Sequence, residues 1–185
     1  MSSSYKLNVA GVTRELPLCR VNDELYIAAF VMFGDVEITK ACAAELLKKA
    51  PEYDVMITAE SKGIPLLYEM ARQAGVNDYI VARKGAKLYM EDVIFTEVDS
   101  ITTEAKQRLC IGKKEADAMR GKRVLIVDDV ISTGESLAAL EKLIKTVGGN
   151  IVGKMAVLAE GDAIGRDDII CLAPLPLFNP DGSEK

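Results

Sequence analysis

The sequence predicts an α/β fold with a central, mostly parallel sheet flanked by helices. Twice along the chain, an apolar strand leads through a short polar turn into a helix with apolar residues at helical spacing, and another strand follows. The first succession spans about 54–82 and the second about 124–159. Because a helix between two strands of one sheet usually makes those strands parallel, this alternation predicts a parallel sheet covered by helices.

The composition indicates one soluble domain. The 185 residues are 49% hydrophobic and 28% charged, which is typical of a globular protein with a sizeable core. The net charge of −5 disfavours a nucleic-acid partner, and no uncharged run reaches the ~20 residues of a membrane helix. The absence of histidine removes the commonest general base and zinc ligand, and the four cysteines form no C-x-x-C pair. We therefore expect a cytoplasmic protein with reduced thiols and no membrane partner.

The expected elements follow from helix caps and apolar runs. Asp35 stands where an N-cap belongs, Pro65 near a first helical turn, and Gly75 just past a last one. The stretch 83–105 lacks a clear period and is expected to be a mobile loop or β-excursion that could act as a lid. In order, we expect short strands within 5–33, a helix over 36–50, a strand over 54–58, a helix over 65–74, strands over 78–82 and 109–111, a helix over 113–119, and strands over 151–159 and 169–172.

The most informative residues are two adjacent acids, Asp128 and Asp129. They follow four branched aliphatic residues, Val124–Val127, and are expected to stand at the carboxyl end of a buried strand. Ligands of parallel sheets bind beyond such ends. Acids are rarely buried without partners, so their position favours a ligand that donates hydrogen bonds to carboxylates.

The turn after the acids predicts an anion site. Backbone N–H groups from about Ile131 to Ser136 would point at a ligand beside the positive end of a helix dipole. A sugar phosphate suits this arrangement, because the N–H groups can bind its phosphate and the carboxylates can accept hydrogen bonds from its hydroxyls. The alternative for the turn is an ordinary capping box of Ser132 and Glu135.

The stretch Val124–Ser136, VLIVDDVISTGES, resembles the 5-phosphoribosyl-1-pyrophosphate (PRPP) signature of type I phosphoribosyltransferases. The resemblance implies that Asp128 and Asp129 are catalytic and hold the ribose hydroxyls, while the following loop wraps the 5′-phosphate. The family usually carries Gly and Thr at the last two positions, so Glu135 is a departure whose carboxylate should point away from the phosphate. The implied phosphate-binding residues are Ile131, Ser132, Thr133, Gly134, Glu135 and Ser136.

A second anion site is expected at Glu60–Gly63, between a strand and a helix. The segment is similar to the pyrophosphate loop of purine phosphoribosyltransferases. Adenine enzymes often place Ser-Arg-Gly there, so Lys62 keeps the charge but loses the bidentate fork. The basic pair at the next strand end looks like that of adenine and xanthine enzymes, although solvated surface cations are the ordinary alternative. The implied pyrophosphate-binding residues are Glu60, Ser61, Lys62, Gly63, Arg83, Lys84 and Lys87.

Two further sets of residues are candidates for contact with the base. By resemblance, a flexible loop near 100–104 closes over the substrate, and Glu104 or Glu97 would assist the purine's proton loss. Solvated loop acids are the alternative. Aromatic rings that could stack on a purine, although core packing is the role expected first for each, are Phe30, Phe33 and Phe178.

The resemblance covers about 54–159 and implies a single phosphoribosyltransferase domain over 1–185, with a small hood from about 1–33 and 173–185. It implies a pentosyltransferase that moves the 5-phosphoribosyl group of PRPP to a purine base, adenine favoured, and releases pyrophosphate in purine salvage. It also implies a homodimer and Mg²⁺, which would be held through PRPP, with Asp128 and Asp129 as its candidate protein contacts. The alternatives are a xanthine or guanine enzyme, and a PRPP-binding regulator of the same fold without catalysis.

Overall fold

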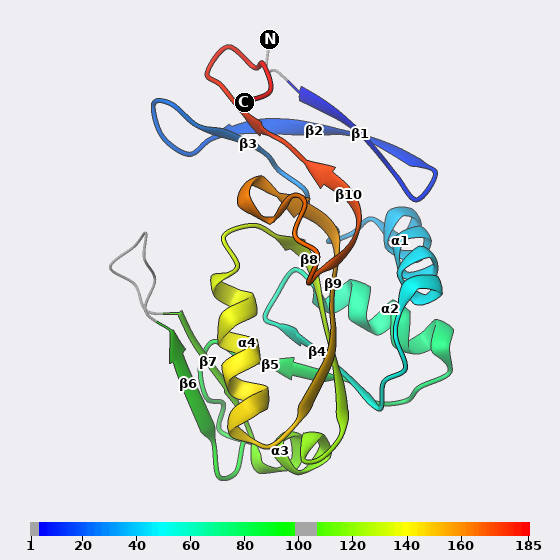
Figure 1. Ribbon diagram of the computed structural model, residues 1–185, viewed down its shortest axis with the longest axis vertical. Helices are drawn as coiled ribbons and strands as arrows, with labels where there is room; N and C mark the ends of the chain where they lie inside the picture. The colour runs from blue at the N-terminus through cyan, green and yellow to red at the C-terminus, as the bar shows by residue number, and fades with distance from the viewer. Residues whose placement is uncertain (1–3, 99–106) are drawn as a thin grey trace.

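The computed structural model describes residues 4–98 and 107–185, and its main sheet has five parallel strands in the order β10-β9-β8-β4-β5 (Figure 1). This arrangement confirms the predicted α/β fold. Strand β8 lies at the centre because its aliphatic residues are buried on both faces. The strands are β4 (Val55–Ala59), β5 (Ile80–Ala82), β8 (Arg123–Ile131), β9 (Asn150–Glu160) and β10 (Ile170–Leu175).

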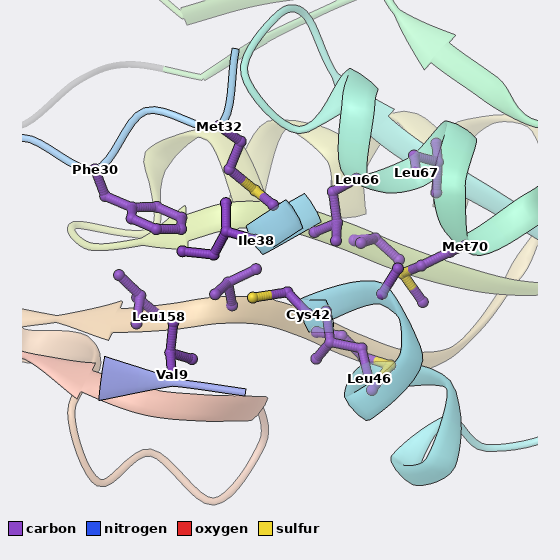
Figure 2. Close-up of a cluster of buried hydrophobic side chains, with 14 of the residues drawn as sticks. Val9, Phe30, Met32, Ile38, Cys42, Leu46, Leu66, Leu67, Met70 and Leu158 are labelled. Atoms are coloured by element: carbon purple, nitrogen blue, oxygen red, sulfur yellow. The ribbon is translucent and has the colours of Figure 1, made fainter. Parts of the chain in front are cut away.

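Helices cover both faces of this sheet. On one face, α1 (Val36–Lys49) and α2 (Ile64–Ala74) pack through Ile38, Cys42, Leu46, Leu66, Leu67 and Met70, which Figure 2 shows meeting in one cluster. On the other face, α3 (Lys113–Met119) and α4 (Glu135–Thr146) cover Val124 and Ile126 of β8. The predicted helix boundaries agree with these within about one residue, a normal scatter for helix ends. Asp35 is the N-cap of α1, because its carboxylate accepts the N–H of Ile38 at 3.1 Å.

A second, antiparallel sheet is built from both ends of the chain. Its order is β1-β2-β3-β11, and Figure 1 shows it across the end of the molecule where β8 and β9 finish. We call this sheet the hood. The rings of Tyr5 and Phe178 pack at 5.2 Å between centroids, which ties its two chain ends together. Its strands are β1 (Ser4–Val9), β2 (Val12–Arg20), β3 (Tyr26–Ala28) and β11 (Leu177–Phe178).

A two-stranded hairpin occupies part of the stretch that lacked a clear period. Strands β6 (Ile94–Val98) and β7 (Gln107–Ile111) pair antiparallel, and Figure 1 shows them beside α4. The β-excursion, one of the two alternatives for 83–105, is therefore correct for β6, and β7 contains the strand expected over 109–111. The short helix η1 (Gly161–Ala163) follows β9. Within residues 4–98 and 107–185, no helix combines the length and apolar character that crossing a membrane requires.

An ion-pair cluster joins the hood to the main sheet. Arg14 of β2 binds Asp35 through Nε at 2.7 Å and Nη2 at 3.0 Å, and Nη2 also lies 2.7 Å from Glu37. The hydrogen bonds from Arg14 are the main reason that the pKa of Asp35 lies below its ordinary 3.8. Asp35 thus caps α1 and anchors a hood strand at once.

We expect Arg14→Gln to lower the Tm near neutral pH, with a difference from the wild type that shrinks below pH 3.8. A carboxylate with a depressed folded-state pKa stabilises the fold above its unfolded-state pKa, and that stability is lost as the pH falls through the folded-state pKa. Differential scanning calorimetry from pH 7 to pH 2.5 would measure this. Arg20→Gln is the control, because the Arg20–Asp23 ion pair is exposed and local to one turn. An Arg14 variant with a pH-independent deficit would contradict the assignment.

Candidate functional site

The acid pair lies within a strand and not beyond its end. The sequence predicted Asp128 and Asp129 at the carboxyl end of the strand, and β8 continues two residues beyond them, to Ile131. The reason is that β9 is long enough to keep pairing with it, with Asp128 opposite Ala156 and Ile131 opposite Ala159. The acids nevertheless lie close to the carboxyl end of the sheet, where the hood covers it (Figure 1).

The carboxyl groups of Asp128 and Asp129 interact directly with each other. The N–H of Asp129 donates to Oδ1 of Asp128 at 2.9 Å, and the Asp129 residue is only 3% exposed. Burial raises the pKa of Asp128 well above its ordinary value, and the adjacent Asp129 carboxyl raises it further by repulsion and hydrogen bonding. Such a pair is poised to accept hydroxyl hydrogen bonds or to face positive charge.

Lys62 reaches the acid pair from the turn after β4. Its Nζ lies 2.9 Å from Oδ2 of Asp129, while half of its own side chain stays exposed. Within the described chain, that Oδ2 atom is buried and has no partner in hydrogen-bonding geometry. The contact is therefore an ion pair that leaves the oxygen open to a better donor. The predicted Glu60–Gly63 site and the acid pair are thus parts of one site.

Position 63 requires glycine because a side chain would not fit there. A Cβ on this residue would stand 2.4 Å from Oγ1 of Thr58 and 3.1 Å from Oδ1 of Asp128. Its φ of −72° is ordinary, so space and not conformation requires glycine here. The backbone after Lys62 can therefore pass directly against the acid pair.

The basic strand end joins the same loop through Glu60. Oε2 of Glu60 accepts the N–H of Lys84 at 3.0 Å and lies 3.3 Å from Nε of Arg83. The bond from the Lys84 N–H is the largest cause of a lowered pKa of Glu60, and the charges of Arg83 and Lys87 contribute. The structure thus brings Glu60, Arg83, Lys84 and Lys87 together, with Ser61 exposed in the turn and a cis peptide bond between Glu60 and Ser61.

The turn after β8 forms a small cradle. A cavity of about 60 Å³ is lined by Asp128 and by residues 130–137, which include all six predicted phosphate-binding residues. The N-cap of α4 is Gly134 in the left-handed region, with φ 81°, and it has no side chain to accept the first N–H groups of the helix. The capping box of Ser132 and Glu135 is therefore wrong, because Ser132 lies two residues before the cap. The first residues of α4 line the cradle instead, and their N–H groups have no partner within the helix.

The other predicted residues have different positions. Glu104 falls in 99–106, outside the described residues. Glu97 lies in β6, with Oε1 3.6 Å from Nε of Arg108. Phe30 and Phe178 are core residues at 4% and 2% exposure, whereas Phe33 is half exposed.

Three residues near the site were missed. Thr58 is fully buried in β4 beside Gly63. Glu160 ends β9, where burial raises its pKa and the charge of Lys62 opposes that shift. Arg166 lies against the cradle, where Nη1 would be 3.3 Å from a Cβ on Gly134. Only Glu160 had a signal in the sequence, as an acid directly after a predicted strand.

Known proteins are similar to this chain over most of its length. Residues 35–173 match the phosphoribosyl transferase domain. The chain is 29% identical over 128 residues to a xanthine phosphoribosyltransferase of Exiguobacterium sp., a match that covers 69% of this chain and 64% of the relative. It is 33% identical over 132 residues to a hypoxanthine/guanine phosphoribosyltransferase of Methanosarcina barkeri, covering 71% and 65%. The chain thus spans slightly less than two thirds of the length of these two relatives.

A solved structure is similar over most of the fold. The adenine phosphoribosyltransferase of Thermoanaerobacter pseudethanolicus superposes with a TM-score of 0.65 at 26% identity, covering 77% of this chain and 84% of that one. The domain match spans residues 35–173, a range that includes the acid pair and both of its flanking loops.

Proposed function

The chain belongs to the phosphoribosyltransferase family, and from that premise we propose that it transfers the 5-phosphoribosyl group of PRPP to a purine base and releases pyrophosphate. The fold is the type I phosphoribosyltransferase fold. The observation that carries the proposal is the buried acid pair with an anion site on either side. The backbone cradle lies at the start of α4, and Lys62 approaches from the other loop.

Each part of the site has a task in this proposal. The ribose hydroxyls donate to Asp128 and Asp129, and the first-turn N–H groups of α4 with Thr133 and Ser136 hold the 5′-phosphate. Lys62, Arg83, Lys84 and Lys87 face the pyrophosphate, and Glu60 acts as a positioning residue that holds the basic strand end against the loop.

The chemistry is a substitution at C1′ of the ribose. The bond from C1′ to the pyrophosphate oxygen breaks, and pyrophosphate leaves with the electron pair. A purine nitrogen forms the new bond to C1′, and its displaced proton passes to a carboxylate, for which Glu104 stays the predicted residue, or to water. Positive charge develops on the ribose as the leaving group departs, and the carboxylates of Asp128 and Asp129 stabilise it.

Mg²⁺ suits the charges of this site. Oδ2 of Asp129 is buried without a hydrogen-bonding partner among the described residues, and the two adjacent acids repel each other. Described residues offer no cluster of three or more acids, cysteines or histidines that could hold a metal. The ion would therefore bind mainly through substrate oxygens, with Asp128 and Asp129 nearby. When bound, Mg²⁺ would neutralise part of the negative charge of the pyrophosphate.

Adenine is the base that we favour. The structural neighbour named above is an adenine enzyme, and the predicted Arg-Lys strand end points the same way. Xanthine and guanine are the next candidates, because the relatives carry those names at similar identity. The cytoplasmic location stays a prediction from the composition, and the homodimer stays a prediction that the resemblance implies.

We expect pyrophosphate release from PRPP and Mg²⁺ in the presence of adenine, and little with guanine, hypoxanthine, xanthine or uracil. A coupled pyrophosphate assay with each base in turn tests this. Release with another purine would correct the base and keep the reaction. If the protein binds PRPP but releases pyrophosphate with none of the bases, it is a PRPP-binding regulator and not an enzyme. If it does not bind PRPP, the proposed function is wrong.

A further inference from the structure

Arg166 is held at the edge of the phosphate cradle by a two-point ion pair. It lies in the connection from β9 to β10, just after η1. Nε donates to Oδ1 of Asp168 at 2.8 Å, and Nη2 donates to Oδ2 of Asp168 at 2.7 Å. A guanidinium bound by two parallel hydrogen bonds has a fixed plane, so the direction of its third nitrogen is fixed as well.

The Arg166–Asp168 ion pair is connected to α4 through Lys154. Oδ2 of Asp168 also accepts Lys154 Nζ at 2.6 Å, and the same Nζ lies 2.8 Å from Oε1 of Glu141. Glu141 belongs to α4, the helix whose first turn forms the cradle. The chain from Arg166 to α4 therefore connects the β9–β10 loop to the helix that would hold the phosphate.

The third nitrogen of Arg166 lies beside Gly134, one of the residues that line the cradle. Nη1 would stand 3.3 Å from a Cβ on Gly134, the left-handed N-cap residue of α4. Among the described residues, Nη1 has no hydrogen-bonding partner, although Nε and Nη2 both have one. A side chain at position 134 would crowd this nitrogen, and glycine avoids that contact.

We propose that Arg166 donates a charge-assisted hydrogen bond from Nη1 to the 5′-phosphate end of the substrate. This inference rests on the proposed function and adds a residue that lies outside the Val124–Ser136 motif. The two cations and two acids of the network cancel in formal charge, so the contribution is a directed donor and not a general positive field. Charge-assisted bonds of this kind are about twice as strong as neutral ones.

Arg166→Gln should weaken ribose 5-phosphate binding about tenfold and leave pyrophosphate binding unchanged. Arg166→Lys should be nearly as weak, because a lysine that pairs with Asp168 cannot also direct a fixed donor at the cradle. Isothermal titration calorimetry with ribose 5-phosphate and, separately, with Mg²⁺-pyrophosphate measures both. In turnover, KM for PRPP should rise while kcat changes little, the pattern of a uniform binding contact.

Lys154→Gln is the matched control, since it disturbs the same network without removing the donor at the cradle. We expect a lower Tm and unchanged ribose 5-phosphate affinity from it. Equal weakening by Lys154→Gln and Arg166→Gln would overturn the inference in favour of a structural role, as would an Arg166→Gln variant of wild-type affinity. If the wild type binds ribose 5-phosphate but turns over no base, the enzyme assignment fails and the Arg166 test still stands. If the wild type does not bind it, both fail.

Discussion

Asp128→Asn and Asp129→Asn are each expected to lower kcat by a factor of about 10²–10³, the usual cost of removing one group that stabilises transition-state charge. The double variant should have no measurable turnover. Both carboxylates face the place where the ribose would become positive, and an amide carries no negative charge to balance it. The measurement is initial-rate pyrophosphate release at saturating PRPP and base. Normal turnover in the double variant would refute the assignment of the acid pair.

The same Asp128→Asn change should stabilise the protein without ligand. Burial and the Asp129 carboxyl raise the folded-state pKa of Asp128, so its ionised form destabilises the fold at neutral pH. The penalty is absent below the ordinary value of 3.8 and grows as the pH rises towards the folded-state pKa. We therefore expect the Tm of Asp128→Asn to exceed that of the wild type at pH 7. The two curves should meet near pH 3.

Asp117→Asn is the matched control for both effects. Asp117 is an α3 carboxylate whose pKa is lowered by its bond to Lys113, so the same substitution there should leave kcat unchanged and should not raise the Tm. A Tm gain in both variants would mean that general charge reduction, and not relief of a buried pair, is responsible.

Gly63→Ala is expected to lower kcat/KM about 100-fold, because a shift of about 1 Å in a positioning loop has effects of that size. The added methyl would stand 2.4 Å from Oγ1 of Thr58 and 3.1 Å from Oδ1 of Asp128. Thr58 is β-branched and fully buried, so its side chain cannot simply turn away. The loop that carries Lys62 must move instead. Overpacking of this kind should also lower the free energy of unfolding by about 1–3 kcal/mol.

Two further variants separate positioning from stability. Gly153→Ala meets Leu125 Cδ1 and Pro51 Cγ at 2.9 Å, at the opposite end of β9. It should lower the Tm while kcat/KM stays normal. Thr58→Ala removes the 2.4 Å contact and should restore part of the lost activity when combined with Gly63→Ala. If Gly63→Ala keeps wild-type kcat/KM, the close approach of this loop to the acids is not required.

The sequence predicted the elements whose signals are local. The helix over Lys113–Met119 and the N-cap Asp35 were placed correctly because capping and apolar spacing act within a few residues. The parallel sheet followed from two strand–helix–strand units. Of the β6–β7 pair, only part of β7 was predicted as a strand, over 109–111, while β6 fell in a stretch expected to be a loop or β-excursion, because the residues of β6 show no clear period.

The parts of the site that depend on distant partners escaped prediction. Strand β8 extends past the two acids because it continues to pair with β9. The residues around the acids give no sign of this pairing in the sequence. The tight fit at Gly63 depends on Thr58 and Asp128, and the position of Arg166 depends on Asp168 and α4. In each case the sequence contains the residue, but the residue that it contacts belongs to another element of the fold.

The hood has a consequence for synthesis of the chain on the ribosome. Strand β3 pairs on one side with β2, but its other neighbour, β11, is the last strand to be made. Until Leu177 and Phe178 emerge, the edge of β3 and the ring of Tyr5 have no final partner. The sheet over the carboxyl ends of β8 and β9 can therefore close only after the parallel sheet has been translated. An unpaired strand edge during that interval is a site where nascent chains can associate.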